Sequence, residues 1–229
     1  MAEEKETKEK KNKKEKKKTE EKVQEFQENL FEDLKLFGKW KSDVEVRDPG
    51  LKRYITLKPI IIPKSCGARD YRERFQKSKM HIVERLALHL IVSGHSAKKH
   101  KITSGKFGGG LYTALKVIEK AFEIIEKRTG KNPIEVLVRA IENAAICEEV
   151  TGYQLGGIIA RVAVVTSPQR RVDKALRIIC QSAYKISFNN KIDIANALAE
   201  ELINASENSS KSLAIAYRER TEQEAMGAR

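Results

Sequence analysis

Hydrophobic side chains recur at steps of three and four residues through most of the chain after residue 79, which is the spacing of a buried helix face. Five stretches show this pattern: residues 80–90, 111–125, 134–141, 172–179 and 194–205. A sixth, highly charged helix is predicted from about residue 214 toward the C-terminus. Gly130 is placed to cap the second helix at its C-terminus, and Asn132-Pro133 begin the third. The pattern therefore predicts a bundle of about six helices.

The pattern changes between the third and fourth helices. Two runs of β-forming residues flank Gly156-Gly157, a two-residue connection typical of a tight β-hairpin. The second run ends at Ser167-Pro168, where a serine N-cap followed by proline predicts the start of the next helix. The expected fold class is mainly α: a helical bundle with one protruding β-hairpin at about residues 150–166, plus an extended N-terminal arm.

The first third of the chain lacks this regular spacing. Residues 1–22 contain ten Lys and seven Glu and no apolar face, so we expect a disordered tail. The tail either only solubilises the chain or becomes ordered on RNA or a neighbouring protein. Residues 23–78 are expected to form an arm packed on the core and anchored by Trp40. Within it, residues 54–57 and 60–62 are predicted to be extended, because Pro59 and Pro63 prevent regular helix. Residues 79–229 form the predicted helical domain.

Positive charge is spread well beyond the tail. The formal net charge is +13, of which residues 1–22 contribute only +3. Residues 49–69, 85–118, 151–172 and 174–192 contain no Asp or Glu. This balance favours an anionic partner, and the acid-free intervals predict an extended positive face.

Two basic clusters are candidate phosphate-binding groups. Residues 95–110 combine glycines with lysines, so that backbone N–H groups and ammonium groups can approach phosphate together. The helix after the hairpin carries cations on one side, opposite its apolar face, and arginine can bind phosphate through two nitrogens. The alternatives are a solvated loop for the first cluster and structural salt bridges to Glu148 or Glu149 for the second. The cations are Lys98, Lys99, Lys101 and Lys106 in the loop, and Arg170, Arg171, Lys174 and Arg177 in the helix.

A series of motifs, in order along about residues 30–229, resembles a known family. They include LFGKW at residues 36–40, TGKNPIEVLVRAIENA at 129–144, the Gly-Gly hairpin, SPQRRVDKAL at 167–176 and LAEELINA at 198–205. In these motifs the chain is similar to the universal small-subunit ribosomal protein of the head domain, seventh in the bacterial small-subunit series, in its archaeal and eukaryotic form.

The resemblance implies a structural, non-enzymatic component of the small ribosomal subunit in the cytoplasm. Such a protein binds the 3′ major (head) domain of the rRNA, nucleates head assembly, and places its hairpin near exit-site tRNA and mRNA at the subunit interface. Neighbouring head proteins are also expected partners. Carried over by position, the rRNA-binding residues are Lys98, Lys99, Lys101, Lys106, Arg69, Arg72, Arg74, Lys77, Lys79, Arg170, Arg171, Lys174 and Arg177. The hairpin residues near tRNA and mRNA are Gln154, Leu155, Gly156, Gly157 and Arg161.

Other chemistry has little support in the sequence. Gly105-Lys106 is followed by Phe107 rather than Ser or Thr, which argues against a nucleotide-binding loop. The three cysteines are scattered without a CxxC motif, and the histidines lack metal-site spacing. We expect no cofactor, metal or small-molecule substrate, and no membrane association, since no apolar run is long enough to span a bilayer. A repressor of its own mRNA, a duplex-DNA-binding protein and an rRNA-modifying enzyme stay as alternatives.

Overall fold

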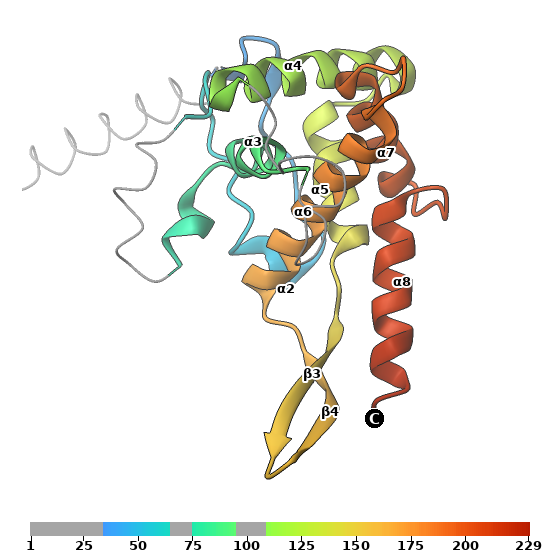
Figure 1. The fold of residues 1–229 in the computed structure, drawn as a ribbon. Coiled ribbons are helices and arrows are strands. Elements are labelled where there is room, and N and C mark those ends of the chain that lie inside the picture. The colour runs from blue at the N-terminus through green and yellow to red at the C-terminus, as the bar shows by residue number, and fades with distance from the viewer. Residues whose placement is uncertain (1–33, 65–74, 95–108) are drawn as a thin grey trace, which may run out of the picture.

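In the computed structural model the described residues are 34–64, 75–94 and 109–229, and their elements are mostly helical (Figure 1). Seven α-helices lie in these ranges: α2 (Pro49–Lys52), α3 (Ile82–Ile91), α4 (Gly110–Thr129), α5 (Pro133–Ala144), α6 (Pro168–Ser187), α7 (Ile194–Ser206) and α8 (Leu213–Met226). A 3₁₀ helix, η2 (Gln76–Lys79), precedes α3. Two antiparallel strand pairs complete the described elements: β1 (Lys35–Leu36) with β2 (Trp40–Lys41), and β3 (Glu148–Leu155) with β4 (Ile158–Val165). The predicted mainly α fold class is confirmed.

Helix α7 lies at the centre of the bundle. It packs against α4, α5 and α6, and its side chains at Leu198 and Leu202 are fully buried. Helix α4 lies across the end of the molecule opposite the β3–β4 hairpin (Figure 1). Phe122 of α4 and Leu137 of α5 belong to the same core cluster. Removing these apolar faces from water, at roughly 25 cal/mol per Å², is what holds the helices together.

The helix boundaries follow local sequence signals. Asn132 Oδ1 accepts a hydrogen bond of 3.1 Å from the backbone N–H two residues further on, just ahead of the first full turn of α5. Gly130 ends α4 with a φ of 66°, a conformation that glycine adopts without strain. Ser167 and Pro168 begin α6, although the Ser167 side chain makes no capping hydrogen bond. These boundaries confirm the starts and the stop predicted from the sequence.

A buried carboxylate fixes the start of α8. Glu201 of α7 is only 2% exposed. Its Oε1 accepts hydrogen bonds from the Ser212 hydroxyl at 2.7 Å and from the Ala214 N–H at 3.0 Å. Because a carboxylate near a helix N-terminus is stabilised by the unpaired N–H groups there, these bonds secure α8 alongside the rest of the bundle.

The N-terminal arm is attached to α4 through Trp40. This residue is 4% exposed, and its ring meets that of Phe122 edge to face with 5.6 Å between centroids. Its indole N–H donates a 3.0 Å hydrogen bond to Glu126. The neighbouring Lys39 ammonium contacts Glu119 at 2.8 Å and Glu123 at 2.6 Å. Trp40 therefore holds the arm in the way that its size and single polar group predict.

The rest of the described arm contains the short helix α2 and no strand of a ladder. Leu51 and Ile55 are buried in the core, next to α2. Within residues 54–57, which were predicted to be extended, Thr56 makes an isolated β-bridge with His81. Residues 60–62, also predicted to be extended, form neither helix nor strand. Burial of Leu51 and Ile55 against the helices attaches this segment to the bundle.

Strands β3 and β4 form a regular ladder that projects from the helices (Figure 1). The register closes with Leu155 opposite Ile158, which leaves Gly156 and Gly157 as the turn. Gly156 has a φ of 60°, so a side chain at this position would be strained. The hairpin predicted from the Gly-Gly pair is confirmed. Beside it, α8 packs along β3 and the C-terminus lies near the hairpin.

Candidate nucleic-acid interface

The cations in the first two turns of α6 are held by carboxylates from other elements. Arg170 binds Glu149 through two contacts, Nε to Oε1 at 2.5 Å and Nη2 to Oε2 at 3.1 Å. Lys174 contacts the same carboxylate. Arg171 Nη2 lies 3.1 Å from Asp48 Oδ2, which links α6 to the cap of α2. The structural salt bridges considered as the alternative for this helix are therefore present.

The shared carboxylate changes the charge at the base of the hairpin. Burial raises the pKa of Glu149, but hydrogen bonds from Arg170 and Lys174 outweigh it and lower the pKa below its ordinary value. Glu149 is thus ionised and offsets one of the two positive charges beside it. Arg170 still has 56% of its side chain exposed, whereas Lys174 has 19% exposed. Arg170 is therefore the better placed of the two to meet a ligand.

Further along α6 the cations have no such partners. Arg177 and Lys185 have exposed side chains, and no described carboxylate lies within ion-pair distance of either. Both line a groove of about 760 Å³ between α3, α6 and α8. The groove also includes Lys174, Arg220 and Tyr217. Among the described residues that line it, none is Asp or Glu, so it favours an anionic ligand.

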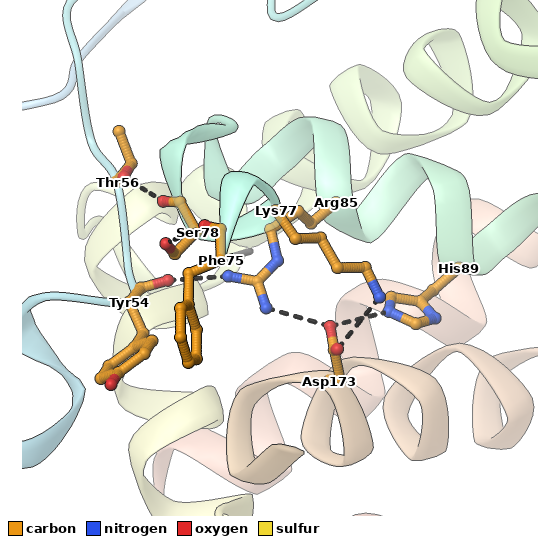
Figure 2. A network of polar contacts seen from close by, with 8 residues as sticks. All are labelled: Tyr54, Thr56, Phe75, Lys77, Ser78, Arg85, His89 and Asp173. Atoms are coloured by element: carbon orange, nitrogen blue, oxygen red, sulfur yellow. Dashed lines mark hydrogen bonds and ion pairs between the residues drawn. The ribbon is translucent and has the colours of Figure 1, made fainter. Parts of the chain in front are cut away.

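One turn before Arg177, α6 also carries a partly buried charge network that joins it to η2 and α3 (Figure 2). The Asp173 carboxylate accepts hydrogen bonds of 3.0 Å from Arg85 Nη2 and from Lys77 Nζ, and His89 Nε2 lies 3.6 Å away. Arg85 is 1% exposed and also donates a 2.7 Å hydrogen bond to the Tyr54 carbonyl. Lys77, a predicted rRNA ligand, therefore has its ammonium paired with Asp173, although 41% of its side chain is exposed.

This network keeps Asp173 charged. Burial raises the pKa of Asp173, but hydrogen bonds from His89, Lys77 and Arg85 outweigh burial and hold the pKa well below its ordinary range. The network could not be predicted from the sequence, because Arg85 and Asp173 are 88 positions apart. The only sequence signal was the isolated Asp173 between two acid-free intervals.

The hairpin residues predicted to lie near tRNA and mRNA fall into two places. Arg161 is exposed on β4, opposite Gly152 in the register. At the tip, the Gln154 amide donates a 3.1 Å hydrogen bond to the Gly156 carbonyl. The tip brings together Gln154, Leu155, Gly156 and Gly157. The structure thus groups four of the five residues and leaves Arg161 partway along the strand.

The remaining predicted rRNA-binding residues are placed only in part. Lys79 is exposed at the end of η2. Outside the described residues lie Lys98, Lys99, Lys101, Lys106, Arg69, Arg72 and Arg74. The interface that can be examined is therefore the hairpin, α6 and the groove beside it. Lys185 and Arg220, which the sequence analysis did not select, extend this interface along α6 and α8.

The described residues offer little other chemistry. They include no group of three or more His, Cys, Asp or Glu side chains arranged to hold a metal ion. Burial raises the pKa of the Cys180 thiol, which makes it a poor nucleophile. The His81 ring is 3% exposed, and its Nδ1 accepts the Val83 N–H at the start of α3. Searched over the same residues, the helices include none that is long and apolar enough for a bilayer.

Comparison with known proteins gives consistent matches over most of the chain. The family model described as ribosomal protein S7p/S5e matches residues 51–229, which include α3 to α8 and the β3–β4 hairpin. The small ribosomal subunit protein uS7 of Nanoarchaeum equitans (strain Kin4-M) is 52% identical over 197 residues. The aligned part covers 86% of this chain and 99% of that relative.

Proposed function

Because the chain belongs to the ribosomal protein S7p/S5e family and is a structural protein of the small ribosomal subunit, we propose that it binds the 3′ major (head) domain of the rRNA directly. In this proposal it nucleates assembly of the head in the cytoplasm and acts without catalysis. The observation that carries the proposal is the placement of exposed cations on α6 at the base of a projecting hairpin. Phosphate neutralisation by such cations supplies much of the affinity of RNA-binding proteins.

The hairpin itself supports a role inside a larger assembly. Ile158, Ile159 and Val165 have exposed fractions of 75%, 71% and 82%, which is unusual for three large apolar residues on one short element. Arg161 supplies its single charge between residues 152 and 166. We propose that Arg161 and the tip at Gln154–Gly157 lie near exit-site tRNA and mRNA, while the apolar strand faces meet neighbouring head proteins.

The structure allows the predicted rRNA ligands to be ranked. Arg170 and Arg177 are exposed and are proposed as direct phosphate ligands. Lys174 is proposed as a weaker ligand, because Glu149 already binds it. Arg171 and Lys77 have their charges engaged by Asp48 and Asp173. We propose that these two act mainly by holding the arm and η2 in position.

The proposal is tested by the salt dependence of binding to a transcript of the 3′ major domain of small-subunit rRNA. Unrelated structured RNA and random duplex DNA serve as competitors. The wild-type chain should bind the rRNA fragment in preference to both. Replacing Arg170 and Arg177 together by Ala should weaken binding about tenfold and reduce the salt slope by about two, one for each lost phosphate contact.

The matched control removes a positive charge from the other end of the molecule. Lys127 is exposed on α4, on the side that carries Glu119 and Glu123. Lys127→Ala should leave both the affinity and the salt slope unchanged. Equal affinity of the wild-type chain for all three nucleic acids would refute the proposal and leave only a general polyanion binder. A preference for duplex DNA would favour the DNA-binding alternative.

A further inference from the structure

The groove between α3, α6 and α8 combines a charged rim with apolar walls. Its charged rim is formed by Arg177 and Lys185 of α6 and by Arg220 of α8. Its walls are apolar and aromatic, and include Ile178 and Tyr217. Its volume of about 760 Å³ is in the range of pockets that enclose small organic groups. A purely electrostatic phosphate site would not need the apolar walls.

The cations are arranged along the groove rather than gathered at one point. Arg177 and Lys185 are eight residues apart on α6, which corresponds to about 12 Å along the helix axis. The carboxylates Glu149 and Glu224 lie in the adjoining depression toward the hairpin, where they pair with Lys174 and with Arg220, respectively. The uncompensated charge therefore extends along the α6 side of the groove, from Arg177 to Lys185.

The aromatic and polar groups in the wall suit a nucleobase. Tyr217 is 43% exposed, and Leu213 one helical turn before it lines the same groove. Gln181 of α6 lines the groove as well and adds a polar amide beside these apolar side chains. An aromatic face with a polar group beside it matches the face and the edge of a base.

We propose that this groove holds one unpaired nucleotide of the bound RNA, with its base against Tyr217 and its flanking phosphates on Arg177 and Lys185. The proposal rests on the proposed function, since it assigns a part of the rRNA to a particular site. A base in a duplex is stacked on both faces and paired along its Watson–Crick edge, so it cannot enter such a groove. Unpaired bases in RNA are characteristically stacked on aromatic side chains while basic residues follow the backbone.

The test uses the full chain and the same 3′ major domain transcript. Tyr217→Ala should weaken binding about tenfold through the loss of one base–aromatic stack. The salt slope should stay unchanged, because no charge is removed. Tyr217→Phe keeps the ring and should bind like the wild type. Lys185→Ala should instead reduce the salt slope by about one. Chemical probing of the complex should show one unpaired nucleotide regaining reactivity in Tyr217→Ala, with the rest of the footprint retained.

The outcomes separate this inference from the proposed function. If the wild-type chain prefers the transcript but Tyr217→Ala and Lys185→Ala both bind as it does, with unchanged footprints, the groove is not an RNA site and the inference fails alone. If these variants bind RNA normally but are lost from subunits reconstituted with the other head proteins, the groove holds a protein segment. That result also overturns the inference that it holds a nucleotide. Failure of the wild type to prefer the transcript would instead refute the proposed function.

Thermal unfolding of each variant identifies any loss of fold, and the exposed Lys185 gives a variant whose folding is not at risk.

Discussion

Helix α6 carries two groups of charges that have opposite roles. In the first group, Asp173 is surrounded by Arg85, Lys77 and His89, and the arginine is almost completely buried. In the second, Arg177 and Lys185 are exposed, and no described carboxylate lies within ion-pair distance of either. The first group is paired within the protein and joins segments of the fold. The second is uncompensated and available to a ligand.

The difference shows that the net charge of a basic protein overstates its binding surface. Of the four cations predicted on α6, Arg170 and Lys174 share the carboxylate of Glu149, and Arg171 is paired with Asp48. Only Arg177 has no such partner among the described residues. Positive charges that lie within ion-pair distance of a carboxylate either support the fold or must exchange that partner for phosphate.

The largest expected effect comes from breaking the buried group. Asp173→Asn removes the negative charge that compensates Arg85, which is 1% exposed. Leaving a buried charge without its partner typically costs about 3–5 kcal/mol, so we expect a loss of that size in the free energy of unfolding measured with denaturant. Asp43→Asn is the control, because Asp43 is exposed and lies outside the network. A loss below about 1 kcal/mol would mean that the network contributes little to the fold.

Acid should also weaken the fold, through the buried His81 at the start of α3. Burial lowers the pKa of His81 from 6.5 to about 4. Between these values the unfolded chain binds the proton more readily than the folded chain does, so the free energy of unfolding rises with pH over this window. The rise is complete above about pH 6.5. The expected loss on acidification to pH 4 is about 3 kcal/mol. Lysine and arginine stay charged throughout, so acid weakens the fold while leaving the cations of the groove unchanged.

The variant that checks this pH dependence is His81→Asn. Asparagine is a good helix N-cap and keeps an acceptor for the Val83 N–H, but it does not titrate. The stability of this variant should be nearly flat from pH 6.5 to about pH 5, above the ordinary pKa of the paired carboxylates. Below about pH 3.8 both proteins should lose stability, because the pKa of Asp173 is lowered in the fold and its stabilising contribution disappears as pH falls below the ordinary value. Parallel curves for the two proteins at all pH values would exclude His81 as the source.

These contrasts mark the limit of what the sequence could predict. Apolar spacing and turn residues were sufficient for the helices, the Gly156–Gly157 turn and the start of α6, because these depend on near neighbours in the chain. Ion pairs could not be predicted in the same way, since Arg85 meets Asp173 only after the bundle has formed. The groove had no sequence signal either, because Lys185 of α6 and Tyr217 of α8 come together only through helix packing. Which cations stay available for binding was therefore decided by tertiary structure.

The smallest expected effect concerns Glu149. Its cation partners are paired, as in the first group, but one of them, Arg170, is exposed, as in the second. Glu149→Gln keeps the shape of the side chain and removes its charge, so Arg170 and Lys174 should become available to phosphate. We expect the affinity for the 3′ major domain transcript to rise about threefold and the salt slope to increase by about one. The cost in stability should be about 1 kcal/mol or less, because Arg170 is more than half exposed. Glu148→Gln is the matched control, since this neighbouring carboxylate pairs with Arg229 instead.

The opposite result would change the interpretation of the hairpin base. If Glu149→Gln weakened binding while Glu148→Gln did not, Glu149 would be positioning Arg170 for the RNA rather than competing with it. The bidentate contact at 2.5 and 3.1 Å gives this alternative a physical basis, because it fixes the guanidinium plane against β3. A fixed guanidinium loses less side-chain entropy when phosphate binds to its remaining N–H groups. The sign of the change in affinity thus decides whether Arg170, while paired with Glu149, supports only the fold or also binds the RNA.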